Sequence, residues 1–205
     1  MKTVLSLLIT VILLMTVIGT VPTVFAEEFK YPLVSEEIRI KYWSGTMHEG
    51  VVKIGDWYYG LNTNSSTKEK YINAVCGYDG NETEITIPTE IDGYIIDTIK
   101  AFHLFSNTVE IIKIPKGITS IKSGYDRNGN TTLLGDETYF SFEGTTKLKE
   151  IIVDSENEKF MSKDGVIFSK SGYTLYFYPP KKLDVEYTVP SIVGKIETGA
   201  LWYQR

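Results

Sequence analysis

Few side chains in this 205-residue chain could do catalytic chemistry. Its two histidines, His48 and His103, lie outside any motif that supplies a nucleophile or a second metal ligand. The single cysteine, Cys76, shares one predicted strand face with apolar neighbours, as a small buried residue does. The adjacent glutamates Glu36 and Glu37 would face opposite sides of a strand and are expected in solvent. We therefore predict no enzyme activity, no cofactor and no Cys/His metal site.

One loop, residues 126–137, resembles a calcium-binding loop. Oxygen-bearing side chains stand at its first, third and fifth positions, and Glu137 stands at its twelfth. The sixth position, which needs glycine for a sharp turn, is Thr131, and no helical pattern flanks the loop. A plain Asn/Gly turn is therefore the favoured interpretation, and we predict no metal.

Two aromatic clusters, residues 57–59 and 176–178, have side chains that could stack on sugar rings. Aromatic side chains on strands more often pack in a core or under a cap. A carbohydrate-binding module that uses these clusters is therefore the alternative function for the chain.

A short recurring pattern would place a different set of candidate binding residues. It alternates two apolar positions around a variable one and ends in proline, at residues 85–88, 112–115 and 187–190, with a degenerate copy at 151–154. The alternation predicts a strand with one buried face, and proline ends the strand because it lacks an N–H group. The middle residue of each strand should point outward on the concave face. These candidate ligand-binding residues are Thr86, Lys113, Ile152 and Thr188. A solvated face with no ligand is the other interpretation that the pattern allows.

The segments that follow these strands also recur, with a turn, a second apolar pair and an anchor such as Ala101-Phe102. One such unit cannot bury its apolar face alone, so units are expected to stack with parallel strands in register. The stacking would align Ile85, Ile112 and Ile151 in one buried column.

The remaining segments complete the predicted organisation. An insertion at about 155–182 contains two β-prone runs, 163–168 and 173–178, and is expected to form a β-hairpin. Residues 27–80 hold strand candidates at 51–54, 57–59 and 71–76, and we predict an N-terminal β cap there. The repeats with their hairpin insertion would then occupy residues 81–205.

The first 26 residues have the layout of a secretory signal peptide. Lys2 precedes a long apolar run, and the small residues Val24 and Ala26 stand at the positions that signal peptidase requires. An uncleaved membrane anchor is the other interpretation. The net charge of −5 argues against nucleic acid as the partner.

Residues 85–102 and 109–121 resemble the BspA-type, or Treponema-type, leucine-rich repeats. The family pattern is similar to L-x-x-I-x-I-P-x-x-V-x-x-I-x-x-x-A-F, although the cysteine that usually follows A-F is missing here. The resemblance implies a leucine-rich-repeat solenoid, a right-handed superhelix of short parallel strands with irregular returns. It also implies a bacterial cell-surface or secreted protein, often an adhesin or a protein of unknown role.

These observations predict an exported protein, secreted or on the cell surface, that binds a macromolecular partner. A protein on a host or a neighbouring cell is the expected partner, and a glycan is the alternative. Nucleic acid and stable membrane insertion after signal cleavage are not expected.

Overall fold

The computed structural model describes residues 29–43, 49–122, 142–143, 146–182, 186–197 and 200–201. Residues Tyr31–Arg205 form one compact unit, and the fold below is the fold of that unit. The predicted boundary at residues 80 and 81 falls within this unit and stays a prediction. The predicted signal peptide, the loop 126–137 and His48 lie outside the described residues.

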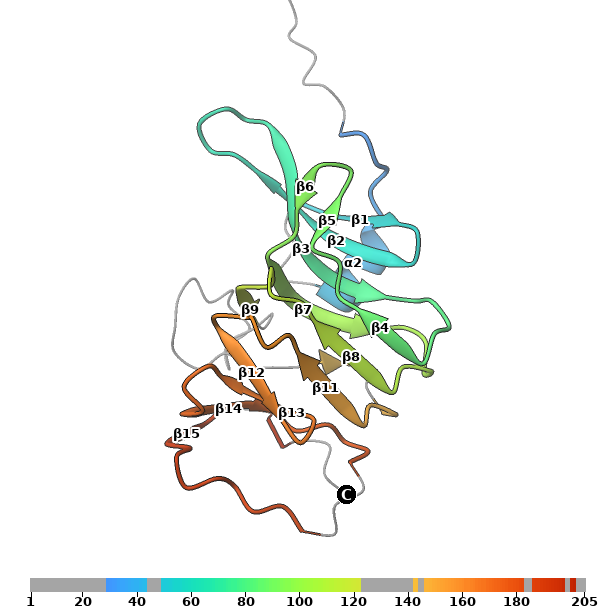
Figure 1. Cartoon of the computed structure of the whole chain (residues 1–205). Coiled ribbons are helices and arrows are strands. Elements are labelled where there is room, and N and C mark those ends of the chain that lie inside the picture. The colour runs from blue at the N-terminus through green and yellow to red at the C-terminus, as the bar shows by residue number, and fades with distance from the viewer. Residues whose placement is uncertain are drawn as a thin grey trace, which may run out of the picture. The chain divides into compact units, whose positions relative to one another are not determined.

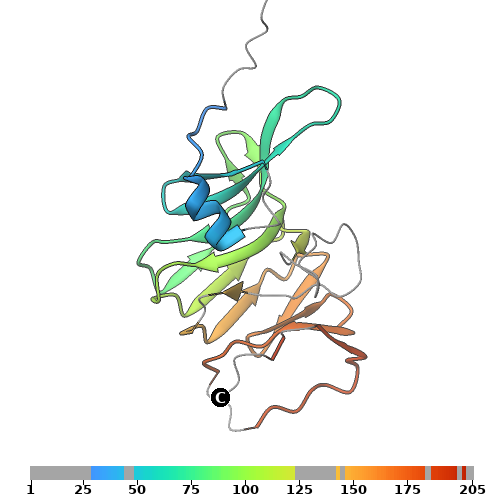
Figure 2. The same ribbon diagram turned by 180° about the vertical axis from the view of Figure 1, so that it is seen from behind.

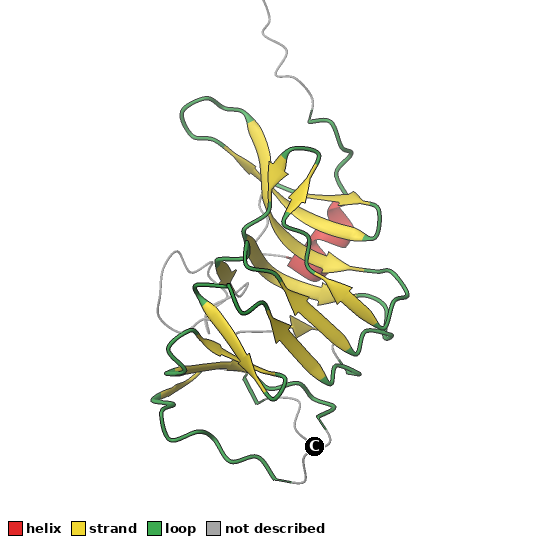
Figure 3. Ribbon diagram, in the orientation of Figure 1, coloured by secondary structure: helices red, strands yellow, loops and turns green. Residues whose placement is uncertain are grey.

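The described part of the chain is mostly β-structure, with one helix (Figures 1 and 3). Its largest sheet has the order β1-β2-β3-β7-β10, and β9 pairs with the same strand β7 as β10 does. The first three strands are antiparallel, whereas the pairs β3–β7, β7–β9 and β7–β10 are parallel. The strands predicted at 51–54, 57–59 and 71–76 are therefore confirmed. The strands are β1 (Val51–Ile54), β2 (Trp57–Thr63), β3 (Lys70–Tyr78), β7 (Thr98–Leu104), β9 (Ser120–Lys122) and β10 (Phe142–Glu143).

A second sheet contains the recurring pattern. Its strands β4 (Glu84–Thr86), β8 (Ile111–Ile114) and β11 (Glu150–Val153) lie side by side and are all parallel (Figure 1). Ile85, Ile112 and Ile151 occupy one register row, and all three are buried. The predicted in-register column is therefore confirmed for these three strands.

A short hairpin separates β4 from β7. It consists of β5 (Glu90–Ile91) and β6 (Tyr94–Ile95), which pair in the antiparallel sense. Its two turn residues, Asp92 and Gly93, both have positive φ, at 47° and 82°. Two positive φ values are what a type I′ turn requires, and Asp-Gly is a favoured pair for it.

A third sheet, of order β12-β13-β14-β15, holds the predicted hairpin insertion. β13 (Val166–Ser169) and β14 (Thr174–Phe177) are antiparallel, which confirms that hairpin. The sequence did not predict β12 (Phe160–Lys163), which pairs with β13 across the tight turn Asp164-Gly165. The last strand, β15 (Lys195–Ile196), lies parallel to β14.

The strand predicted at 187–189 is wrong, because residues 186–190 form no strand. The insertion occupies the edge of β11 that a fourth repeat strand would need. The Ile151 N–H donates to Gly165 O at 2.9 Å, and the Val153 N–H donates to Ser162 Oγ at 2.9 Å. The edge groups of β11 are thus already bonded, and the chain returns to pair with β14 instead.

The helix α2 (Glu36–Trp43) was also not predicted. Ser35 Oγ accepts a hydrogen bond from the Ile38 N–H at 3.4 Å, as an N-cap residue does. Acidic Glu36 and Glu37 lie in the first turn and basic Lys41 in the last, so their charges complement the helix dipole. Figure 2 shows α2 against the antiparallel end of the largest sheet.

Candidate binding surface

Three of the four predicted binding residues lie together on the outward face of β4, β8 and β11. Thr86 pairs in register with Lys113, and Lys113 pairs in register with Ile152. We call these three residues the outward column. Ile152 is 36% exposed and the Lys113 side chain is 41% exposed, and Thr86 is exposed as well. Successive strand residues face opposite sides, so the buried isoleucines of the pattern turn the outward column toward solvent.

A second outward row runs beside this column. It consists of Glu84, Ile111 and Glu150, which also share one register. Lys113 Nζ lies 2.6 Å from Glu84 Oε1 and so joins the two rows across neighbouring strands. An exposed ion pair of this kind adds little stability, in the range of about 0–1 kcal/mol. The outward face therefore carries an ion pair next to two isoleucines, Ile111 and Ile152.

Thr188, the fourth predicted residue, is exposed, but it lies in the segment that forms no strand. No strand pairing holds it beside the other three. The outward column therefore has three members rather than the predicted four.

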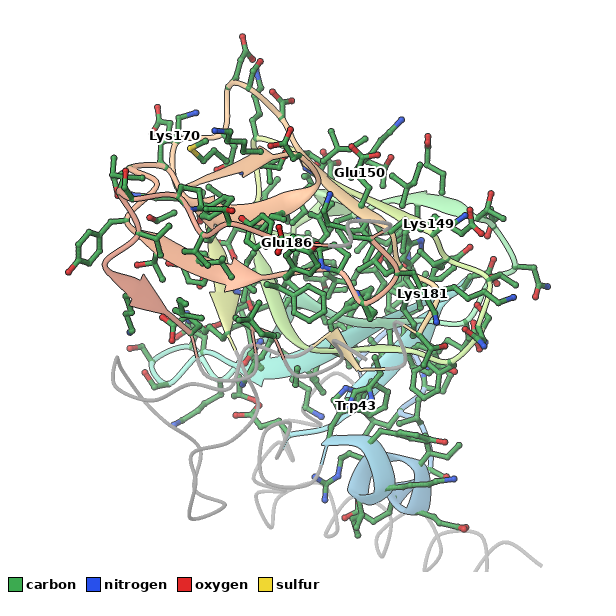
Figure 4. The ribbon with its side chains drawn as sticks, turned by 90° about the horizontal axis from the view of Figure 1, so that it is seen from below. Trp43, Lys149, Glu150, Lys170, Lys181 and Glu186 are labelled. Carbon is green, nitrogen blue, oxygen red and sulfur yellow. The ribbon has the colours of Figure 1, made fainter. Side chains whose placement is uncertain are left out.

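The hairpin turn Asp164-Gly165 closes one side of the outward face. A methyl group placed on Gly165 would lie 2.9 Å from Cγ of Glu150, so the turn backbone packs directly on that side chain. Figure 4 labels Glu150 together with Lys149 and Lys181 on the same side of the molecule. The Lys181 N–H donates to Leu148 O at 2.9 Å, which fixes the segment after β14 next to the segment that leads into β11.

One residue that positions this face was missed by the sequence analysis. The Asn157 side chain is fully buried and makes four hydrogen bonds. Its Nδ2 donates to Pro115 O at 3.0 Å and to Ile118 O at 2.8 Å, and its Oδ1 accepts from the Lys159 and Phe160 N–H groups at 2.9 and 2.8 Å. Asn157 thus ties the turn after β8 to the start of β12. A lone polar residue after Asp154 gives no sequence signal for this role.

The first aromatic cluster does not form one exposed platform. Tyr59 is buried, and burial raises the pKa of its hydroxyl to about 12. Trp57 packs against Tyr78 at a ring-centroid distance of 4.7 Å, and Tyr58 packs against Phe105 at 4.8 Å. Trp57 and Tyr58 both remain partly exposed.

The second aromatic cluster is also mostly core. Phe177 and Tyr178 are buried, and Tyr176 is half-buried with its ring 5.6 Å from that of Phe160. Both clusters therefore serve mainly in packing, which is the interpretation that the sequence favoured.

Trp43 anchors α2 to the largest sheet. Its side chain is fully buried, and its Nε1–H donates to Cys76 O at 3.2 Å and to Ala101 O at 3.1 Å. His103 lies beside this indole, with ring centroids 5.8 Å apart. Cys76 is buried as predicted, and burial raises the pKa of its thiol well above the ordinary value.

Among the residues whose positions are described, no three His, Cys, Asp or Glu side chains come together as a metal-binding group. Within the same ranges, no helix has the length and apolar character needed to cross a membrane.

No model of a known protein family matches the chain, and no curated protein matches it. Among solved structures, it is similar to a leucine-rich repeat protein from Eubacterium ventriosum ATCC 27560, with 14% identity and a TM-score of 0.35 over 73% of this chain and 56% of that one. It is also similar to the pneumococcal vaccine antigen PcpA, with 16% identity and a TM-score of 0.29 over 74% of this chain and 61% of that one. A leucine-rich cell surface protein from Faecalibacterium prausnitzii A2-165 gives 15% identity and a TM-score of 0.26, over 74% of this chain and 67% of that one. The chain thus spans between about half and two thirds of the length of these proteins.

Proposed function

We propose that this chain is an exported leucine-rich-repeat protein, secreted or on the cell surface, that binds a macromolecular partner through the outward face of β4, β8 and β11. The supporting observation is the register that joins Thr86, Lys113 and Ile152 on one solvent-facing column. A solenoid built from units stacked in this way would bind along an extended face of this kind.

The composition of the face favours a protein as the partner. Two isoleucines, Ile111 and Ile152, lie beside the Lys113–Glu84 ion pair. Apolar groups with charged groups around them are the usual make-up of a protein interface. The face of these strands measures roughly 10 Å by 13 Å. A standard interface buries about 800 Å² per partner, so the partner must also contact the surrounding loops.

The setting of the proposed function follows from the predicted signal peptide at residues 1–26. An exported protein meets molecules outside the cell, so a host surface or a neighbouring cell is the expected location of the partner. Adhesion is the activity that this arrangement would serve.

The test is affinity capture with the full chain as bait, followed by the double variant Lys113→Ser/Ile152→Ser. We expect the variant to lose the captured partner or to bind it at least tenfold more weakly.

A matched control is Lys70→Ser/Ile95→Ser, which changes the same residue types at exposed positions on other sheets. Urea unfolding should give similar stability for both variants. Undiminished capture by a folded Lys113→Ser/Ile152→Ser chain contradicts the proposal. Binding to a glycan array that Trp57→Ala abolishes would support the carbohydrate alternative.

A further inference from the structure

Charged residues at the starts of the parallel strands change sign along the stack. The first two strands are preceded or begun by acids, Glu82 and Glu84 at β4 and Glu110 at β8. The next two segments carry bases, with Lys147 and Lys149 before β11, which itself begins with Glu150, and Lys181 and Lys182 after β14. We call this row the strand-start rim.

Backbone hydrogen bonds fix the order of the rim. The Glu110 N–H donates to Thr83 O at 2.7 Å, and the Lys149 N–H donates to Glu110 O at 2.8 Å. The Lys181 N–H then donates to Leu148 O at 2.9 Å. Neighbouring strands lie about 4.8 Å apart, so the acidic end and the basic end are separated by roughly 14 Å.

The middle of the rim is neutralised within the chain, and Glu84 at its acidic end also forms an ion pair, with Lys113. Lys149 Nζ lies 2.8 Å from Glu110 Oε2, which joins the acidic half to the basic half. Glu82 at one end and Lys181 at the other are exposed. Glu150 and Asp164 lie beside the basic half and offset part of its charge, but Glu150 is packed under the Gly165 backbone.

We propose that the strand-start rim is a docking site for a second copy of this chain in the antiparallel orientation. A two-fold axis between β8 and β11 would place Glu82 of each copy opposite Lys181 of the other. It would likewise place Glu110 opposite Lys149. Interfaces built on a two-fold axis need this kind of self-complementary surface.

Other partners fit the rim less well. A uniformly anionic polymer would meet Glu82, Glu84 and Glu110 along half of its path, and a uniformly basic one would meet the lysines. Like charges brought face to face oppose binding, whereas a second copy brings Glu82 opposite Lys181 and Glu110 opposite Lys149. The net charge of −5 per chain opposes self-association, but salt near 0.15 M screens it beyond about 8 Å. Pairs in contact across the rim are screened much less, so low-to-moderate salt should favour the dimer. Dimer formation through the rim does not require a partner on the outward column.

A charge-swap experiment tests this docking. The chain is expressed in full so that any processing occurs, and sedimentation velocity is measured over a concentration series at low and high salt. We expect a reversible dimer that weakens at least tenfold at high salt. Glu82→Lys alone and Lys181→Glu alone should each weaken the dimer, because each places two like-charged pairs in the homodimer. An equimolar mixture of the two variants should restore it, because in a mixed dimer one pair is swapped and the other is native.

The matched control is Lys170→Glu, since Lys170 is exposed and lies apart from Lys149 and Lys181 (Figure 4). This variant should dimerise as the unchanged chain does. A chain that stays monomeric at all concentrations in low salt overturns the proposal. A mixture of the two charge variants that associates no better than either alone also overturns it, because any dimer would then use another surface.

Discussion

Ile112 on β8 lies directly opposite Ile151 on β11, and neither side chain is exposed to solvent. On the central strand of the sheet, Ile112 therefore stands between Ile85 and Ile151 in one buried row. We predict that Ile112→Ala lowers the free energy of unfolding by about 2–5 kcal/mol, because the truncated side chain leaves a cavity. Ile152→Ala, on the exposed side of β11, should cost less than about 1 kcal/mol. Urea unfolding followed by circular dichroism measures both, and equal effects would place Ile112 outside the core.

Asn157 provides a second test of how the repeats are joined. Asn157→Ala removes four hydrogen bonds, so the Lys159 and Phe160 N–H groups and the Ile118 carbonyl lose this side chain as a partner. The Pro115 carbonyl loses it too but still accepts from the Ile118 N–H at 3.2 Å. Each buried polar group left unsatisfied costs about 1–3 kcal/mol, so we expect a total loss of about 2–4 kcal/mol, since part of the site is open to water. The control is Asn64→Ala, whose Oδ1 accepts two N–H groups in an exposed loop. That change should cost less than about 1 kcal/mol in the same unfolding assay. A stable Asn157→Ala variant would mean that Asn157 does not hold the two segments together.

The buried hydroxyl of Tyr59 predicts a specific loss of stability in alkali. Burial, with a smaller contribution from the nearby Cys76, raises its pKa from the ordinary 10.0 to about 12. The pKa of the Tyr59 hydroxyl is therefore higher in the folded chain than in the unfolded one. Its contribution to the free energy of unfolding is fully present below pH 10 and is lost as the pH rises toward 12. Urea midpoints measured from pH 9 to pH 11 should therefore fall less steeply for Tyr59→Phe than for the unchanged chain.

The matched control for this pH series is Tyr173→Phe. Tyr173 is 56% exposed, so its ring meets water in the folded chain as well as in the unfolded one. Its variant should keep the steep decline of the unchanged chain. If all three chains lose stability with the same slope, the Tyr59 hydroxyl is not shielded from water.

The local sequence was sufficient to predict the elements whose signals lie within a few residues. The apolar alternation that ends at Pro88 and Pro115 predicted β4 and β8, and the same alternation predicted the burial of Ile85 and Ile112. Glycine between two β-prone runs predicted the β13–β14 hairpin. In each case the pattern and the turn residues agreed with the final pairing.

The elements that were missed depend on competition between distant segments. Residues 187–189 have the strand pattern, but Gly165 and Ser162 already bond the edge of β11. Helix α2 alternates apolar and charged residues in a way that resembles a strand, and it is set instead by Ser35 and the anchor Trp43. Such outcomes depend on which distant segment occupies a strand edge or a cavity. A local sequence pattern does not contain this information.

The most direct test of the central claim, that the repeats stack as parallel strands in register with their middle residues outward, is disulfide trapping. In a Cys76→Ala background, the pair Thr86→Cys/Lys113→Cys places two thiols at register partners on β4 and β8. Neighbouring strands lie about 4.8 Å apart, within the Cα–Cα range of about 4.4–6.8 Å that a disulfide spans.

The control pair Thr86→Cys/Lys116→Cys moves the second thiol three residues further along the chain, out of β8 and into the turn that follows it. Mild oxidation followed by thiol counting and mass spectrometry reads out both pairs. Rapid and near-complete bond formation in the Thr86/Lys113 pair, with little in the control pair, is the result that the stacked strands predict. Equal trapping in both pairs, or none at Thr86/Lys113, would contradict the parallel register and the binding face built on it.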